Sequence, residues 1–93
     1  MLTRARMRDR IAERTELKAP IVAQVLDALE DLIREELTQQ GSVVFRGLFR
    51  IVPIRRKFAA RIGDKEQRVE RIVLVVKTST SLRDRLSSVL SPR

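Results

Sequence analysis

The spacing of apolar residues changes abruptly near the middle of the chain, at Gly41. Before this glycine, apolar residues recur three and four positions apart, which predicts an amphipathic helix over residues 20–40 with Gly41 as its C-terminal cap. After it, apolar residues follow a period of two from Val43 to Ile51, as in a β-strand. The chain is therefore expected to combine helices with a sheet.

Two further helices are predicted, one toward each end of the chain. Residues 3–15 form a short polar helix with Thr3 as its N-cap. Thr78 to Ser81 supply N-cap candidates for the last helix, of which Ser81 approximates a capping box with Asp84, and the helix continues through Leu90.

Three antiparallel strands are expected between the second and the last helix. Gly47 predicts a turn between a short strand near residues 43–46 and a longer one beyond it. Gly63 and the four residues after it mark a second reversal, and residues 68–77 return as the third strand. Pro53 lacks a backbone donor, so it is expected at an edge of the sheet or where its backbone nitrogen is on a non-bonded side of the strand.

These elements predict an α+β fold in a single domain that spans residues 1–93. Its parts are a helical hairpin (1–41), a three-stranded antiparallel sheet with a β-arm (42–77), and a short C-terminal helix with a tail (78–93). A chain of this size buries only about two-thirds of the surface that its unfolded form exposes. Association with a second chain is expected because the core will be thin.

The positive charge of the chain is concentrated on the predicted strands. Arg46 to Lys77 contain ten Lys or Arg and three acidic residues, a net of +7 out of +8 for the whole chain. Such localised charge is typical of a protein that binds a polyanion, because each contact with a phosphate releases condensed counterions. A basic surface that serves solubility, or basic edge strands that prevent aggregation, are the simpler alternatives.

The composition disfavours several other classes of function. The chain has no Cys and no His, so it lacks thiolate ligands, the commonest metal ligand and the commonest general base. Asp27, Asp31 and Glu35 form an acidic row on the second helix, and such rows are usually an exposed, solvated helix face rather than a site for a divalent cation. We expect no enzymatic activity, metal, cofactor or small-molecule substrate. No apolar run approaches the about 18 residues of a membrane span, and a cytoplasmic location away from membranes is expected.

A series of short segments occurs in an order that characterises one protein family. The segments are Ile11–Thr15 with Leu17, Val25–Leu29, Gly41, Gly47-Leu48-Phe49, Ala59–Gly63 and Val73–Asp84. Together they resemble the helical hairpin, turn, DNA-binding arm, returning strand and C-terminal helix of the bacterial histone-like HU and integration host factor family. The resemblance covers almost the whole chain.

The resemblance implies an obligate, intertwined homodimer that binds double-stranded DNA with two β-arms reaching round the minor groove. By position, it implies DNA contacts from the arm and its base, from one N-terminal residue and from the last helix. The implied DNA-binding residues are Arg4, Arg46, Arg55, Arg56, Lys57, Arg61, Lys65, Arg68, Arg71, Lys77, Thr80 and Arg83. The expected dimer core comprises Val25, Leu29, Leu32, Ile33, Phe45, Phe49 and Val76.

The predicted arm departs from the family pattern at its tip. Asp64-Lys65 stands where the family has an Asn-Pro pair, whose proline is the wedge that partly unstacks a base step. We therefore expect an architectural, nucleoid-associated protein that binds DNA with little sequence preference and bends it weakly.

Two alternative functions are compatible with the same pattern. One is a partner subunit that forms a heterodimer with an HU-type chain and modifies its DNA contacts. The other is RNA binding, which is disfavoured because Phe58 is the only aromatic residue on the arm that could stack on unpaired bases.

Overall fold

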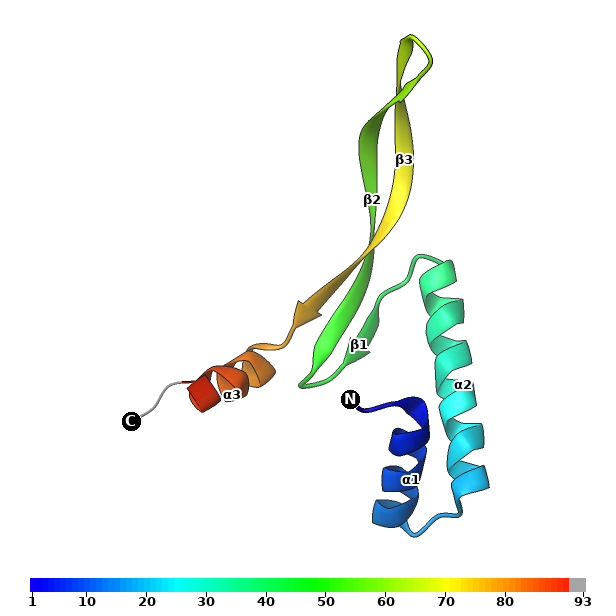
Figure 1. The fold of residues 1–93 in the computed structure, drawn as a ribbon, viewed down its shortest axis with the longest axis vertical. Coiled ribbons are helices and arrows are strands. Elements are labelled where there is room, and N and C mark those ends of the chain that lie inside the picture. Colours follow the sequence, from blue (N-terminus) through cyan, green and yellow to red (C-terminus); the bar gives the residue numbers. More distant parts are fainter. Residues whose placement is uncertain (91–93) are drawn as a thin grey trace. The chain divides into compact units, whose positions relative to one another are not determined.

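The computed structural model describes residues 1–90, so the tail predicted at 91–93 lies outside the described residues. The elements follow in the order α1 (Arg4–Thr15), α2 (Ala19–Thr38), β1 (Val43–Phe45), β2 (Phe49–Ile62), β3 (Lys65–Thr78) and α3 (Thr80–Leu90) (Figure 1). The strands form one antiparallel sheet in the order β1-β2-β3. The predicted α+β class and element order are confirmed.

The chain divides into two compact units, Met1–Glu35 and Glu36–Arg93. The first unit contains α1 and most of α2. The Thr3 side chain caps α1 by accepting a hydrogen bond from the Arg6 backbone N–H at 3.3 Å, as predicted. At the other end of α1, Glu16 takes a left-handed conformation with a φ of 61°. This conformation is costly for any residue with a Cβ, so Glu16 stores local strain.

The end of α2 differs from the predicted cap. Gln40, with a φ of 64°, is the left-handed residue, and Gly41 does not have a positive φ. The Gly41 N–H donates to the Glu36 carbonyl (2.9 Å) and the Gln40 N–H donates to the Leu37 carbonyl (3.0 Å), which together form a Schellman motif. A Cβ at position 41 would meet the carboxyl end of the exposed Glu36 side chain, which can move aside, so neither the backbone conformation nor the available space requires glycine there.

The two turns of the sheet both depend on glycine. Gly47 has a φ of 79° in the loop between β1 and β2, where the Leu48 N–H donates to the Phe45 carbonyl at 2.9 Å. This turn brings the Phe45 and Phe49 rings together, with their centroids 5.1 Å apart. The predicted turn at Gly47 is thus confirmed.

The strands β2 and β3 form a long two-stranded ribbon that extends well beyond β1 (Figure 1). The ribbon reverses at Gly63 and Asp64 alone, since Ile62 pairs directly with Lys65. Gly63 has a φ of 66°, which suits the first position of a type II′ turn. The predicted reversal was therefore too long, and β3 begins at Lys65. Pro53 lies past the end of β1, where β2 has an open edge as expected.

The N-cap of α3 also differs from the prediction. Ser79, not Ser81, caps the helix: its Oγ accepts from the Leu82 N–H at 3.1 Å and its carbonyl accepts from the Arg83 N–H at 3.0 Å. Four Ser or Thr residues follow one another here, and the end of β3 at Thr78 decides which of them is in position. That end point is a tertiary feature that the capping pattern does not contain.

Replacing Glu16 by glycine should stabilise the protein. Glycine accepts the left-handed conformation without a Cβ clash, so Glu16→Gly is expected to raise the free energy of unfolding by about 0.5–1 kcal/mol, after the entropy cost of glycine in the unfolded chain. Chemical denaturation at fixed protein concentration measures the change. Glu16→Ala is the control and should be close to neutral; equal gains in both variants would contradict the strain at this position.

Candidate nucleic-acid interface

The two faces of the β2–β3 ribbon carry different side chains, because residues that pair directly across the ribbon point to the same side. We call each such pair a rung. Face A contains the rungs of odd-numbered β2 residues, such as Phe49↔Thr78, and face B contains the rungs of even-numbered β2 residues, such as Arg50↔Lys77. Arg55, Lys57 and Arg61 all lie on face A.

Face B carries positive charge without any acidic residue. Two of its rungs, Arg50↔Lys77 and Arg56↔Arg71, place like charges directly opposite each other, and Lys65 adds a fifth cation near the tip. Like charges across a rung destabilise a free ribbon. These two rungs therefore favour a bound polyanion, whose charge would remove the repulsion.

Face A of the ribbon is closer to neutral. Its rungs Lys57↔Glu70 and Arg61↔Glu66 place opposite charges across from each other. Arg55 and Arg68 complete the set, so this face holds four cations and two acids. Glu66 and Glu70 of β3 therefore partly neutralise the positive charge that β2 contributes to face A.

Arg55 is held at the base of the ribbon. Its Nε donates a hydrogen bond to the Gln40 Oε1 at 3.2 Å, and Gln40 is the left-handed residue that terminates α2. Arg55 therefore ties the ribbon to the segment that precedes β1.

Aliphatic rungs separate the two basic rungs of face B. Val52↔Val75 and Ile54↔Val73 lie between them, and all four side chains are half-buried. This part of the ribbon offers an apolar surface flanked by cations.

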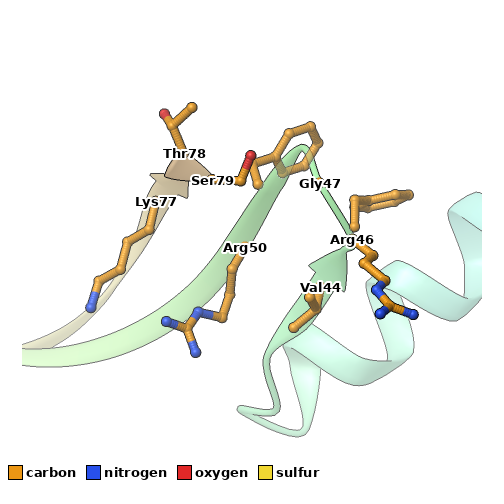
Figure 2. A pocket seen from close by; sticks show the side chains of 9 residues that line it. Val44, Arg46, Gly47, Arg50, Lys77, Thr78 and Ser79 are labelled. Carbon is orange, nitrogen blue, oxygen red and sulfur yellow. The ribbon is translucent and has the colours of Figure 1, made fainter. Parts of the chain in front are cut away.

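The base of the ribbon forms a shallow basic pocket of ≈270 Å³ at the turn between β1 and β2. Figure 2 shows the Arg50 and Lys77 side chains projecting to the same side of the sheet from neighbouring strands, in agreement with their pairing. Arg46 lies in the turn itself, and Ser79, the cap of α3, closes the other side.

The structure exposes the predicted DNA-binding residues that lie in the second unit. Thr80 and Arg83 lie in the first turn of α3, beside the basic pocket's Ser79. The remaining residues lie on the ribbon or in the turn before it. These exposed residues are Arg46, Arg55, Arg56, Lys57, Arg61, Lys65, Arg68, Arg71 and Lys77.

Arg4 lies in the other unit and has partners there. Its guanidinium forms ion pairs with Asp27 and with Glu30 (2.7 Å to Glu30) and donates to the Ala23 carbonyl at 3.3 Å. These contacts link α1 to α2. They give Arg4 an intramolecular role that its sequence position did not indicate.

Arg50 is a residue that the sequence-based list of DNA contacts omits. Its position on the strand indicates only that it points away from Phe49 and Ile51. Its significance comes from Lys77, 27 positions later in the chain, and that pairing depends on the register of the ribbon.

Within residues 1–90, no helix is long and apolar enough to cross a membrane. In the same part of the chain, no group of three or more carboxylates is arranged to hold a metal ion.

The fold and its basic ribbon define a class of small bacterial DNA-binding proteins. The model of the family described as "Bacterial DNA-binding protein" matches residues 2–87, and the chain belongs to this HU-type family. The function of the family, DNA binding by an architectural protein, is therefore the class of function of this chain.

A solved structure shows the same fold. HU from Anabaena, in a cocrystal structure with DNA, matches with a TM-score of 0.74 and 16% sequence identity over 91% of this chain and 97% of that chain. No similar sequence is found among curated proteins. The resemblance predicted from the sequence segments is confirmed.

Two substitutions of equal charge change should affect the ribbon in opposite directions. Arg71→Glu turns the Arg56↔Arg71 rung into an attractive pair, whereas Lys57→Glu turns the Lys57↔Glu70 rung into a repulsive one. We expect Arg71→Glu to raise and Lys57→Glu to lower the opening free energy of β2–β3 amides by about 0.2–1 kcal/mol at low salt. Hydrogen exchange of the free protein measures both. Shifts of the same sign would contradict the register.

Proposed function

We propose that this protein is a homodimeric architectural protein that binds double-stranded DNA with little sequence preference, through phosphates and the minor groove, and organises the nucleoid in the cytoplasm. The observation that carries the proposal is face B of the ribbon, with five cations, no acid and two like-charge rungs. A phosphate backbone beside this face removes the repulsion within the rungs and releases counterions.

The spacing of the basic rungs supports contact with an extended backbone. Arg50 and Arg56 are six residues apart on β2, or about 20 Å along a strand. The aliphatic rungs between them suit the sugar edges that border a groove. Phosphate and sugar contacts position a protein without reading bases, which supports weak sequence preference.

The tip of the ribbon supports weak bending. Sharp kinks need an apolar wedge between base pairs, and the turn itself carries Gly63 and Asp64. Ile62, the nearest apolar side chain, lies on the last rung before the turn, opposite Lys65.

The exposed apolar surface of a single chain supports the homodimer. Val22, at 2% exposure, is the one buried apolar residue that the described chain contains. The expected dimer-core residues Val25, Leu29, Leu32 and Val76 are 59%, 40%, 62% and 61% exposed, and Ile33, Phe45 and Phe49 are half-buried. Each exposed aliphatic side chain gains about 1.5–3 kcal/mol when it is fully buried. A second copy is the simplest source of that burial.

Two double variants that each remove two positive charges test the DNA contact. Arg56→Ala with Arg71→Ala should weaken binding to unrelated duplexes equally and reduce the slope of log affinity against log salt by about two. Lys57→Ala with Arg61→Ala should have a smaller effect, because Glu70 and Glu66 already oppose these cations. Fluorescence anisotropy measures both. A larger loss for the second pair would place the DNA on face A.

The same assay tests the proposal as a whole. If six to ten phosphates are neutralised, the affinity of the natural protein falls roughly a thousandfold or more between ~50 and ~200 mM salt. An affinity that does not change with salt would overturn DNA binding through the ribbon.

The oligomeric state is expected to be a stable homodimer at low micromolar concentration. Leu32→Asp places a charge on the exposed row of α2 and should abolish the dimer together with the cooperative unfolding transition. Mass photometry or analytical ultracentrifugation measures the state. A monomer that dimerises only with an HU-type chain would instead support the role of a partner subunit.

A further inference from the structure

The outer half of face A has a charge pattern that the proposed DNA contact does not use. From base to tip, its rungs are Lys57↔Glu70, Ala59↔Arg68 and Arg61↔Glu66. Lys57, Arg61, Glu66 and Glu70 are all exposed. Within residues 1–90, neither Glu66 nor Glu70 takes part in an ion pair. Their carboxylates are therefore available to cations of another molecule.

This pattern is complementary to itself. Two identical ribbons can stack face to face about a two-fold axis parallel to the strands, which places β2 of one ribbon over β3 of the other. Each residue then lies opposite the second ribbon's copy of its own rung partner. A rung of opposite charges then attracts its copy twice: Lys57 meets Glu70 of the second ribbon, and Glu70 meets Lys57.

The sizes of the side chains agree with the charges. The rung between the two charged rungs pairs the small Ala59 with the long Arg68. In the stacked arrangement, Arg68 of each ribbon lies over Ala59 of the other, which leaves room for its side chain.

Face B cannot stack in this way. Its rungs Arg50↔Lys77 and Arg56↔Arg71 would place like charges against like charges from the second copy. The two faces therefore differ in their partners: face B repels its own copy and favours a polyanion, and face A attracts its own copy.

We propose that face A of the ribbon is a homotypic contact, through which the arm of a second DNA-bound molecule stacks on Lys57, Arg61, Glu66 and Glu70 and bridges two DNA segments. This inference rests on the proposed DNA binding, because each arm must hold its DNA with face B while face A points to a neighbour. Bridging would give the protein a means of compaction that needs no sharp bend.

The contact forms only where arms are concentrated. Exposed ion pairs are individually weak and are screened by salt. Four such pairs do not hold two molecules together at micromolar concentration in solution, but molecules bound along neighbouring DNA segments have a much higher effective concentration. The protein should therefore bridge DNA without forming tetramers in its absence.

Trans-complementation separates this contact from attraction within one ribbon. Lys57→Glu leaves two acids on its rung, and Glu70→Lys leaves two lysines, so in each variant alone this rung repels its own copy and offsets the attraction of the Arg61↔Glu66 rung. When the two variants are mixed, the introduced glutamate of the first meets the introduced lysine of the second, and the unchanged Glu70 of the first meets the unchanged Lys57 of the second. The rung within each ribbon stays repulsive in the mixture, so recovery on mixing can come only from contact between arms. Exchange of subunits does not alter this, because each arm belongs to one chain.

The assay measures how much of a labelled duplex is captured by a bead-bound duplex at ~50 mM salt, where phosphate contacts are strong. Fluorescence anisotropy is used to set the same protein occupancy of the DNA for every variant. The natural protein should capture the duplex, each variant alone should capture at least fivefold less, and the equimolar mixture should restore capture to within twofold. The variant with both substitutions in one chain should behave like the natural protein, because its rung is complementary again.

A mixture of Lys57→Glu with Arg61→Glu is the matched control and should not recover, because neither variant supplies an added cation. Bridging by the single variants at the natural level, or an equimolar mixture that stays defective, would overturn the arm-to-arm contact. Loss of DNA occupancy in the natural protein would overturn the proposed function instead, and the anisotropy measurement distinguishes the two failures.

Discussion

The two-residue turn at Gly63 and Asp64 is the constraint on which the arm depends. Because Ile62 pairs with Lys65, every later rung of the ribbon is determined, down to Phe49↔Thr78 at its base. A turn one residue longer would place Lys57 opposite Arg71 and Arg61 opposite Gln67, and the separation of charges between the faces would be lost. A glycine with positive φ at the first turn position therefore determines the electrostatics of residues about 40 Å away along the strands.

A single free chain has two unfavourable features, an exposed apolar surface and like charges that face each other on the ribbon. A single copy exposes apolar side chains on α2, β3 and α3 that a stable protein of this size has to bury. A free ribbon also holds two like-charge rungs that a stable hairpin would avoid. Under the proposed function, a second copy meets the first deficit and bound DNA meets the second. Both features of the single chain therefore support the proposed homodimer and its contact with DNA.

Much of the fold could be predicted because its signals are local. The period of the apolar residues identified α2 and the strands, Thr3 identified the start of α1, and Gly47 and Gly63 identified the turns. The errors occurred where several equivalent residues compete. Ser79 rather than Ser81 caps α3, and Gln40 rather than Gly41 is left-handed at the end of α2. In both places, hydrogen bonds between residues three to five positions apart decide which candidate takes the position. Amino-acid composition does not distinguish the candidates.

The amino-acid sequence by itself determined the element order, the single concentration of positive charge and the membership of the HU-type family, because each depends on residues close together in the chain or on short segments in order. Only the tertiary structure decided which charges oppose one another. Arg50 and Lys77 form one rung, Lys57 and Glu70 another, and Arg4 pairs with Asp27 and Glu30 in the helical unit. The physical reason is that electrostatic interaction depends on distance in space, and strand register and helix packing bring together residues that the sequence separates.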